Sequence, residues 1–391
     1  MAGYRREHHR EEAMIRSHET MRFVTCLDQT ATTEVQAFLR HHYGEGFYGA
    51  NEAYFDWQYI KNPCKWFAPE LADGKMSING VYDDKTNEIV AVHAYVPFDA
   101  HLGPRLGRGV WDTEWINGSG VKGLGRELAT YLLSQSDVYA GFGMNDMANQ
   151  SFEALGLKIF PEISRHVAVL DHTNLTTHMA ASDYVNEANN VPASASFDAR
   201  LFHVLESAAA IPDSVIAQER KNTAFGVARD SAWMIWRFEQ HPFISYTIVA
   251  ADPDGANGVA VVRTESVVDT DHHVCRIIEF YAMPGQERTL LEATLSYAAD
   301  KDALIVDYFT ASSSRAELFQ QTTSCQSLGM NVNPTVPFMF QPLYINERNS
   351  LNMAIKTSVD LADAFELGTF HATKGDSDQD ILRSEENAPA F

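Results

Sequence analysis

The chain has 391 residues, 45% of them hydrophobic, and a formal net charge of −22. This length predicts two or three domains of ordinary globular composition. The acidic charge argues against nucleic acid or an anionic membrane as the main partner, because both require a positive surface. No apolar run approaches the roughly 20 residues of a membrane span, so we expect a cytoplasmic protein.

The beginning of the chain is charged and lacks the apolar stretch of a signal peptide. We therefore expect residues 1–21 to be a flexible extension, with Met21 as an alternative start. The four cysteines are far apart and form no CxxC motif, which predicts reduced core residues and no metal site. These cysteines are Cys26, Cys64, Cys275 and Cys325.

Two aromatic segments resemble each other, "AYFDWQYIKNPCKWF" and "AWMIWRFEQHPFISY", and Trp57 of the first corresponds to Trp236 of the second. Each segment precedes two apolar runs around a turn, a third apolar run, a helical pattern and a further short apolar run. A shared order at a nearly constant offset predicts an internal duplication of a mixed α/β unit. The alternative is that the two halves share only the general sequence patterns of α/β proteins. The helical spacing of the aromatic residues predicts mainly core packing.

The expected duplication divides the chain into two domains, over residues 22–172 and 197–345. Between them, 173–196 is poor in large apolar residues and is predicted to be a linker. Residues 346–391 form a C-terminal segment whose polar end, from Lys374 onward, is expected to be a loose tail.

The stretch "GSGVKGLGRELATYLL", residues 118–133, passes from four glycines directly into an apolar helical pattern. A strand that leads through a glycine-rich turn into a helix is an anion site, because the first helix N–H groups are unpaired. The loop lacks the Gly-Lys-Ser/Thr ending of a Walker A motif. It spells Gly-x-Gly-x-x-Gly literally but follows a third strand, and no acidic residue suits a ribose further on. A flexible loop is the remaining plain alternative.

The order of elements and several motifs resemble the GNAT superfamily of acyl-CoA-dependent N-acyltransferases. The motifs are "NPCKW", the hairpin, "VWDTEWI", the glycine loop with its helix, and "NDMANQSFEALGLKIF". The resemblance covers about residues 50–167 and implies a tandem of two GNAT-like domains with mixed α/β sheets. The second copy retains Gly285 but lacks the loop, so we expect it to be degenerate and to supply acceptor contacts.

In this superfamily the glycine loop holds the CoA pyrophosphate, and a backbone N–H of the preceding strand polarises the thioester. The resemblance therefore implies acyl-CoA as co-substrate and no metal. Gly123 and Gly125 match the family's loop, whereas Gly120 stands where Gln or Arg is usual. The expected acyl-CoA contacts are Trp115, Ile116, Gly120, Val121, Lys122, Gly123, Leu124, Gly125, Arg126 and Asn149.

The candidate catalytic residues are Asp112, Glu114 and His93. Asp112 and Glu114 alternate on one strand, so we expect them to face one side and to raise each other's pKa, as a general base requires. His93 is a third candidate, although a lone strand histidine is commonly a core residue. Phe152 occupies the position of the tyrosine that protonates the leaving thiolate in many family members. We therefore expect the thiolate to leave unassisted.

Tandem GNAT units with one worn copy resemble bacterial sugar N-acyltransferases, and residues 370–380 resemble the C-terminal segment of that group. This implies transfer of an acyl group, such as acetyl or 3-hydroxyacyl, to a dTDP-type nucleotide-linked amino sugar in surface polysaccharide biosynthesis. Arg165, Arg237 and His241 are the predicted substrate contacts. The alternatives are a polyamine or peptide acceptor, or a non-catalytic acyl-CoA-binding protein.

Overall fold

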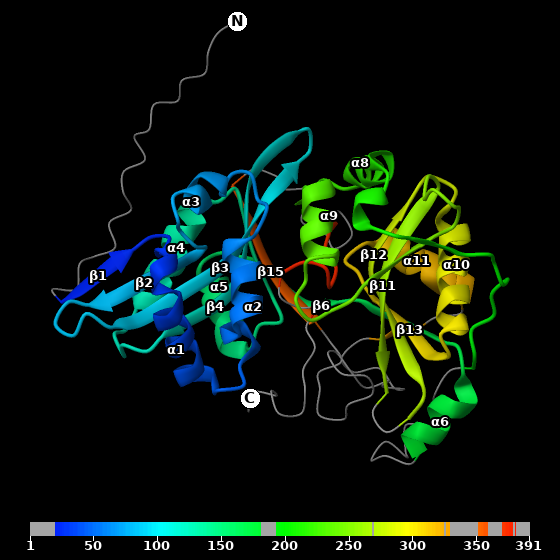
Figure 1. The fold of residues 1–391 in the computed structure, drawn as a ribbon, viewed down its shortest axis with the longest axis horizontal. Helices are drawn as coiled ribbons and strands as arrows, with labels where there is room; N and C mark the ends of the chain where they lie inside the picture. The colour runs from blue at the N-terminus through cyan, green and yellow to red at the C-terminus, as the bar shows by residue number, and fades with distance from the viewer. Residues whose placement is uncertain are drawn as a thin grey trace, which may run out of the picture.

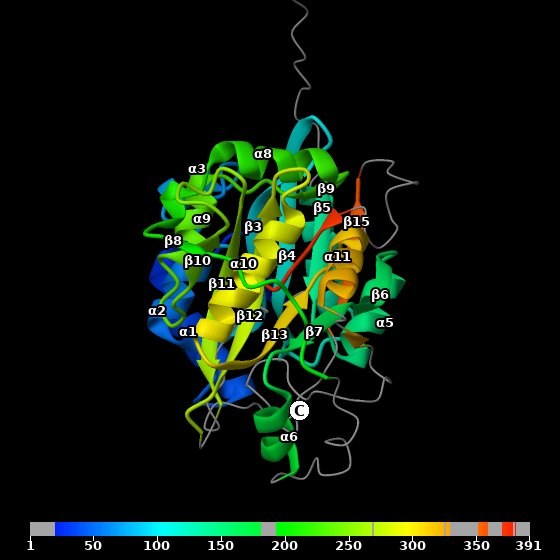
Figure 2. The ribbon, with the colours of Figure 1, turned by 90° about the vertical axis from the view of Figure 1, so that its right-hand side faces the viewer.

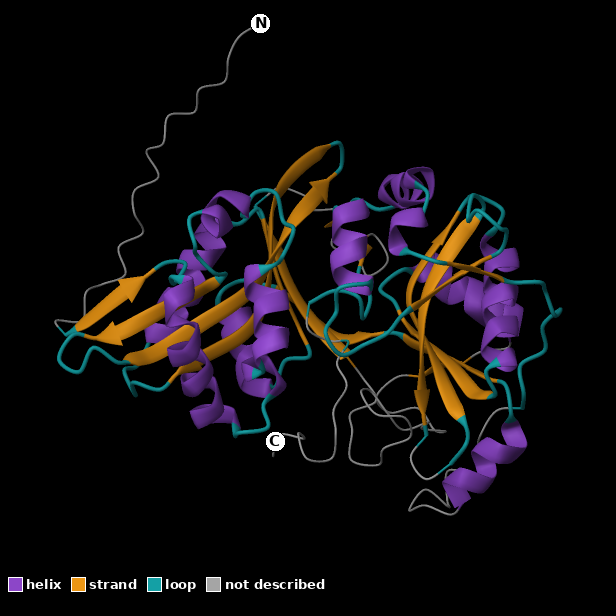
Figure 3. Cartoon of the chain, in the orientation of Figure 1, coloured by secondary structure: helices purple, strands orange, loops and turns teal. Residues whose placement is uncertain are grey.

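The computed structural model describes residues 20–180, 193–267, 270–323, 326–328, 351–358, 370–377 and 380. Two mixed β-sheets lie side by side, each covered by helices (Figures 1 and 3). No helix in the described ranges is long and apolar enough to cross a membrane. Cys325 and most of the proposed extension, 1–19, lie outside these ranges, as do residues 181–192 of the proposed linker.

The first sheet has the order β1-β2-β3-β4-β5-β15-β6, and β9 pairs with both β3 and β16 at its margin. Its strands are β1 (Met21–Val24), β2 (Ile78–Asp83), β3 (Ile89–Leu102), β4 (Arg105–Asn117), β5 (Val138–Phe142), β15 (Leu351–Thr357), β6 (Lys158–Ile163), β9 (Phe225–Val227) and β16 (Phe370–His371).

The second sheet has the order β14-β7-β13-β12-β11-β10-β8. Its strands are β14 (Gln326–Leu328), β7 (Arg165–Val169), β13 (Ala303–Phe309), β12 (His273–Ala282), β11 (Gly258–Ser266), β10 (Thr247–Ala250) and β8 (His203–Leu205). In each sheet a parallel pair, β4–β5 or β12–β13, follows an antiparallel meander.

Strands cross between the two sheets in both directions. β7 follows β6 of the first sheet in sequence but lies between β13 and β14 of the second. Conversely, β15 follows β14 of the second sheet but lies between β5 and β6 of the first. Figure 2 shows β15 beside β5. The proposed domain boundaries remain a prediction, and β7, β9 and β15 pair across them.

Each sheet has helices on both of its faces, so one apolar layer lies on each side of the sheet. One face of the first sheet packs against α1 (Thr32–Tyr43), α2 (Glu52–Phe55) and the π-helical turn η3 (Asp56–Ile60). The other packs against α4 (Leu124–Gln135) and α5 (Asp146–Ala154). The second sheet has α8 (Asp213–Asn222) and α9 (Ser231–Phe238) on its inner face. Its outer face packs against α10 (Glu287–Asp300) and α11 (Ser313–Thr323). The remaining helices are α3 (Ala68–Ala72), α6 (His172–Ala180) and the 3-10 turns η1 (Gln29–Ala31), η2 (Tyr48–Ala50) and η4 (Ala208–Ala210).

Trp57 and Trp236 meet between the two halves. Their rings stack with centroids 4.7 Å apart and an interplanar angle of 13°. Trp57 Nε1 donates to the Trp236 carbonyl at 2.9 Å, and Trp236 Nε1 donates to the Trp57 carbonyl at 3.0 Å. Both indoles are 3% exposed, so the predicted core role of this aromatic pair is confirmed.

The mixed α/β fold with two related sheets agrees with the expected fold class. One local expectation is wrong: the described part of the polar C-terminal segment is not loose. Residues 370–377 and Asp380 are all buried, because they fill the space against β12 and β9 and form ion pairs there. The positions beyond 380 lie outside the described residues.

Candidate functional site

A β-bulge interrupts β4 at Thr113. Ala94 of β3 pairs with Glu114, and Tyr95 pairs with Asp112, so Thr113 has no partner on β3. The parallel pairing of β4 with β5 ends at the same level, at Asp112 and Gly141, although β4 continues to Asn117. Beyond this pair, backbone groups of β4 have no partner on β5, and we call this unpaired edge of β4 the slot.

The bulge places Asp112 and Glu114 on opposite faces of the sheet. Residues paired across antiparallel strands share a face, and faces alternate along β3. Tyr95 therefore shares its face with Asp112, whereas Ala94 shares the opposite face with Glu114. The prediction that the two carboxylates face one side is wrong, because the extra residue reverses the alternation. The argument from mutual carboxylate repulsion therefore does not apply.

Glu114 lies on the α1/α2 face. It accepts a hydrogen bond from Tyr43, and burial together with this carboxylate raises the pKa of Tyr43 above its ordinary value. Tyr59 Oη lies 3.2 Å from Thr113 Oγ1 beside it. An incoming neutral amine on this face would meet a carboxylate at the level of the bulge.

Asp112 lies on the opposite, α4/α5 face within a group that we call the His93–Asp112–Tyr139 cluster. His93 Nε2 is 2.7 Å from Asp112 Oδ2 and 3.3 Å from Tyr139 Oη, and the Tyr139 hydroxyl donates to Asp112 Oδ2. The structure thus brings together Asp112 and His93, two of the three predicted catalytic residues. Burial and the Asp112 carboxylate raise the pKa of Tyr139 well above its ordinary value.

Asn117 organises the loop that follows β4. Its side chain donates to the Val121 carbonyl at 2.9 Å and accepts from the backbone N–H and the hydroxyl of Ser119 at 3.2 and 2.6 Å. Ser119 Oγ in turn accepts from Val121 N at 3.1 Å. The sequence analysis did not single out Asn117, although Asn-Gly-Ser-Gly is a turn signal.

Glycine is required at the four positions of this loop for two different physical reasons. Gly120 and Gly123 have φ of +71° and +89°, and a Cβ on either would meet nothing within 4 Å. A Cβ on Gly118 would lie 2.7 Å from His42 Nε2, and one on Gly125 2.9 Å from Trp115 Nε1. Gly118 and Gly125 therefore permit close packing, whereas Gly120 and Gly123 shape an exposed turn with space in front of it.

The start of α4 offers unpaired donors at this turn. The first intrahelical bond runs from Glu127 N to the Gly123 carbonyl at 3.1 Å, and no side chain caps the helix. The N–H groups of Leu124, Gly125 and Arg126 precede that bond, so they have no helical partner. The Leu124 side chain is 1% exposed and anchors the turn, while Lys122 is exposed beside it.

The remaining predicted acyl-CoA residues surround this turn. Trp115 and Ile116 are half-buried on the bulged end of β4, and Val121 is half-buried in the loop. Arg126 reaches the Ala154 carbonyl at 3.4 Å, at the end of α5. Asn149 on α5 is half-buried, and its Oδ1 has no partner among the described residues. The donors and charges suit a pyrophosphate group, and the slot suits an extended chain beside β4.

Phe152 on α5 closes the α4/α5 face of the slot. It is 2% exposed, stacks on Trp115 at 5.7 Å between centroids and contacts Tyr139 edge-on at 6.0 Å. Phe152 has no proton to give, but the hydroxyl of its neighbour Tyr139 lies within the polar cluster. The sequence "VYAGF" around Tyr139 resembles any buried strand, so no sequence signal pointed to this residue.

The three predicted substrate residues are buried and have protein partners. Arg165 forms an ion pair with Asp307, Nε to Oδ2, at 3.2 Å. Arg237 lies over the Trp57 ring, 5.3 Å from its centroid. His241 Nδ1 accepts from the backbone N–H groups of Phe243 and Ile244 at 3.2 and 3.1 Å. Burial, followed by the charge of Arg237, lowers the pKa of His241 to about 3, which keeps the ring neutral. Through these contacts the three residues help to hold the two halves together.

A second charged group, which we call the tail latch, holds the C-terminal segment against the second sheet. Arg229 donates to Asp376 at 2.8 Å and to Glu279 at 2.7 Å. His371 bridges Glu219 and Glu279 at 2.9 and 2.7 Å. The latch consists of Glu219, Arg229, Glu279, Arg315, His371 and Asp376. With His371 protonated, the three cations and three anions balance.

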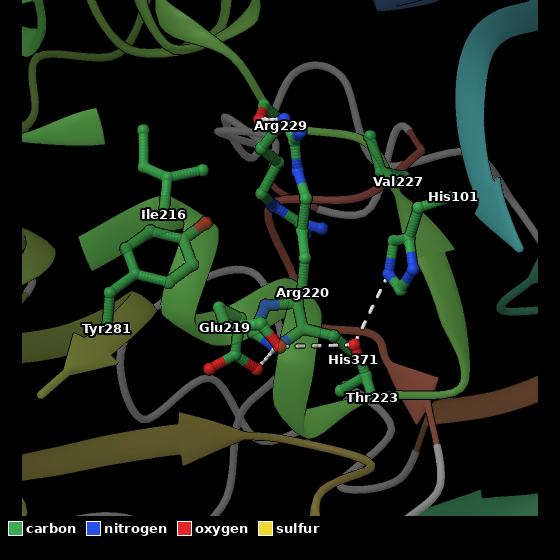
Figure 4. Close-up of a pocket in the computed structure, with 9 residues that line it drawn as sticks. All are labelled: His101, Ile216, Glu219, Arg220, Thr223, Val227, Arg229, Tyr281 and His371. Carbon is green, nitrogen blue, oxygen red and sulfur yellow. Dashed lines mark hydrogen bonds and ion pairs between the residues drawn. The ribbon is translucent and has the colours of Figure 1, made fainter. Parts of the chain in front are cut away.

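A small cavity adjoins the latch, as Figure 4 shows. His101, Tyr281 and Thr223 line it together with Glu219 and His371. Burial, followed by the charge of Arg229, lowers the pKa of His101 to about 4. The cavity lies between α8 and the tail, away from the glycine loop, and it fits a water molecule rather than a substrate.

Comparisons with known proteins leave the family open at the level of sequence. No family model matches the chain, and no curated protein matches it. Solved structures do match. The "conserved protein of unknown function" of Enterococcus faecalis V583, described as a probable N-acyltransferase, shares 9% identity at a TM-score of 0.50. The match covers 90% of this chain and 73% of that one.

Two further solved structures match at lower scores. A GCN5-related N-acetyltransferase of Kribbella flavida is 13% identical at a TM-score of 0.48, over 86% of this chain and 71% of its own. The N-myristoyltransferase of Saccharomyces cerevisiae with bound myristoyl-CoA is 10% identical at 0.46, over 87% and 80%. At these identities the likeness shows the fold alone, and the chain has the mixed α/β fold of the probable N-acyltransferase.

Proposed function

We propose that this protein is an acyl-CoA-dependent N-acyltransferase. One observation carries the proposal: β4 separates from β5 at the Thr113 bulge and runs into a turn whose helix N–H groups are unpaired. That arrangement joins a slot for an extended thioester to a cradle for phosphates. The fold shared with a probable N-acyltransferase supports it.

The chemistry follows from the positions around the bulge. Backbone N–H groups of β4 beyond Asp112 have no partner on β5 and stabilise the oxyanion that forms on the thioester carbonyl. Glu114 on the α1/α2 face accepts the proton of the attacking amine, so that the amine attacks in its neutral form. Holding thioester and amine on either side of one bulge supplies proximity, which contributes much of the rate.

The finer proposal for the acceptor is a dTDP-type nucleotide-linked amino sugar, and it rests on the sequence resemblance. Arg165, Arg237 and His241 each have at least one protein contact, and their part in binding the acceptor stays a prediction. A polyamine is the competing acceptor, and the net charge of −22 favours it through attraction of a cation.

The test combines binding with turnover. Calorimetry with acetyl-CoA and 3-hydroxybutyryl-CoA measures binding, and release of the CoA thiol measures transfer to a dTDP-amino sugar, spermidine or a peptide amine. We expect micromolar acyl-CoA binding and amine-dependent thiol release. Absence of acyl-CoA binding overturns the proposal, and binding without transfer to any amine indicates a non-catalytic acyl-CoA protein. The acceptor that gives the highest kcat/KM decides between sugar and polyamine.

A further inference from the structure

A continuous row of five aromatic rings, which we call the aromatic belt, begins beside Glu114. It consists of Tyr43, Phe47, Tyr48, Tyr54 and Phe243. Successive ring centroids along it lie 4.4, 4.9, 5.1 and 6.4 Å apart. The belt starts at the end of α1, passes through η2 and α2, and ends in the loop after α9. It therefore joins the candidate base to the second half of the molecule.

The two ends of the belt are exposed, although one ring within it is buried. Tyr43 is 38% and Phe243 46% exposed, whereas Phe47 and Tyr48 are half-buried. Tyr54 is 1% exposed and contacts the rings of Tyr48 and Phe243. An exposed aromatic ring forgoes the stabilisation that burial gives, so a contiguous set of such rings marks a binding surface.

The local sequence holds these rings in place. A Cβ on Gly49 would lie 2.6 Å from Phe47 Cε1, so glycine at this position lets the Phe47 ring lie against the backbone. The backbone N–H of Phe243 donates to His241 Nδ1 at 3.2 Å, which fixes the turn that carries the Phe243 ring. The rings of Tyr54 and Phe243 are parallel to within 2°. The belt is thus a built surface rather than a set of loose side chains.

The charges around the belt are mainly negative. Glu45 and Glu52 are exposed on the same segment of chain, and the Tyr43 hydroxyl donates to Glu114. This arrangement suits a positively charged molecule, because carboxylates attract a cation and the face of an aromatic ring does so too.

The lysine and the arginine of this segment have protein partners. Arg40 donates to the Ala50 carbonyl at 3.0 Å, and Lys61 forms an ion pair with Asp56. Residues 41–60 contain no other lysine or arginine. An anionic group such as a pyrophosphate would therefore meet carboxylates and ring faces at the belt, and both repel an anion.

The second sheet uses the equivalent glutamate differently. β12 carries the same bulge, between Ile277 and Glu279. Glu279 therefore corresponds to Glu114, but it pairs with Arg229 and His371 of the tail latch. Glu114 instead accepts a hydrogen bond from the neutral hydroxyl of a partly exposed tyrosine. A cation that approaches along the belt thus reaches a carboxylate at its end.

We propose that the aromatic belt binds the acceptor, and that the acceptor is an aliphatic amine with at least one further positive charge, such as a polyamine. The inference rests on the proposed acyltransferase function and favours one of its two candidate acceptors. The attacking amine gives its proton to Glu114, whereas a second ammonium group stays charged and lies over the rings. A cation within about 6 Å of a ring centroid is attracted to the ring face. The net charge of −22 draws such a molecule from solution.

The first test compares spermidine with propylamine as acceptors for the full chain at saturating acetyl-CoA. Both molecules offer a primary amine on a short alkyl chain, but only spermidine carries further ammonium groups. We expect the KM of spermidine to be about tenfold lower than that of propylamine, with similar kcat. Equal KM values for the two amines, or a higher kcat/KM with a dTDP-linked amino sugar than with spermidine, would overturn the proposal.

The second test removes single rings of the belt. Phe243→Leu and Phe47→Leu each delete one ring and keep an apolar side chain. Each should raise the KM of spermidine about fivefold and leave both the KM of propylamine and the calorimetric affinity for acetyl-CoA unchanged. Phe202→Leu is the matched control, because the Phe202 ring contacts Tyr297 on the outer face of the second sheet. This control should leave the KM of both amines within about twofold.

The readouts separate the belt from the proposed function. If wild type fails to bind acetyl-CoA, the acyltransferase proposal fails. If wild type transfers the acetyl group but neither ring variant changes the KM of spermidine by more than about twofold, only the belt assignment fails. Phe243 is exposed, so its variant decides the question even where Phe47→Leu does not fold.

Discussion

The two sheets share a bulge and a strand order, but they place their polar side chains on opposite faces. In the first sheet the α4/α5 face carries His93, Asp112 and Tyr139, whereas the matching positions of the second sheet are apolar. On the inner faces the contrast reverses. The first sheet has Val96, Phe98 and Trp111 there, packed in the main core. By register these correspond to Arg263, Glu265 and Arg276.

This contrast shows that the same backbone arrangement can carry polar or apolar side chains at corresponding positions. The choice of side chains therefore indicates what each half does. The first half buries its charge beside the slot and glycine turn. The second buries its charge where the C-terminal segment packs, as Arg263–Asp380 at 3.0 Å and Arg276–Glu265 at 2.8 Å illustrate. The polar cluster of the second half holds the C-terminal segment in place.

The largest expected effect separates the two bulge glutamates. Glu279→Gln removes the charge that pairs with Arg229 and His371, so the free energy of unfolding should fall by about 3 kcal/mol. Glu114→Gln should leave stability within about 1 kcal/mol but lower kcat about 100-fold, because it removes the proposed base. Urea unfolding and acyl transfer measure the two effects. Equal losses of stability in the two variants would contradict the proposal that one glutamate is structural and the other catalytic.

The next prediction compares two glycines that precede corresponding helices. Gly123 and Gly285 have φ of +89° and +80°, and both have open space at Cβ. Glutamate at either position costs a similar backbone strain of about 1–2 kcal/mol. Only Gly123→Glu places a carboxylate in the proposed phosphate site, so only this variant should weaken acetyl-CoA binding, by about 100-fold in calorimetry. Equal acetyl-CoA affinities in the two variants would show that the turn before α4 is not the phosphate site.

A smaller effect tests the equivalence of the halves at their contact. Trp57→Phe and Trp236→Phe each remove an indole N–H that satisfies a buried carbonyl, so each should cost about 2 kcal/mol in urea unfolding. Because the two rings touch, the double variant should cost less than the sum of the two. Additive losses would mean that the stack contributes nothing beyond its two hydrogen bonds.

The smallest effect concerns the tail latch and pH. Burial and Arg229 lower the pKa of His371, but Glu279 and Glu219 outweigh them and raise it. A raised folded pKa stabilises below the ordinary histidine value of about 6.5, and the contribution is lost as pH rises through the folded value. The stability advantage of wild type over His371→Gln should therefore shrink as the pH rises above about 6.5.

At lower pH the same latch weakens for a different reason. Burial raises the pKa of Glu219, but Arg315 and His371 outweigh it and lower the value to about 2. Stability from Glu219 is present above its ordinary pKa of about 4.3 and should be lost as pH falls toward 2. Thermal unfolding across pH 3–9 measures both limits, and a flat difference between wild type and His371→Gln would rule out a charged latch.

Local patterns were enough to predict the order of the elements, the correspondence of Trp57 with Trp236, and the turn before α4. Each depends on residues close together in sequence or on a repeated motif. Hydrophobic alternation cannot reveal the Thr113 bulge, because a single extra residue leaves the strand pattern nearly intact and still reverses Glu114. Tyr139 stands in an apolar strand like any core tyrosine, and its hydroxyl gained meaning only from His93 and Asp112 on other strands.

The reciprocal exchange of β7 and β15 has a consequence for how the chain is made. A polypeptide cut within 181–196 yields two fragments: the first holds β7 of the second sheet, and the other holds β9, β15 and β16 of the first sheet. Neither fragment closes its own sheet, so each leaves two strand edges unsatisfied until its counterpart arrives. We expect the fragments to assemble only when they are produced together. The C-terminal half must also be synthesised before the N-terminal sheet is complete, so the protein matures at the end of translation rather than half by half.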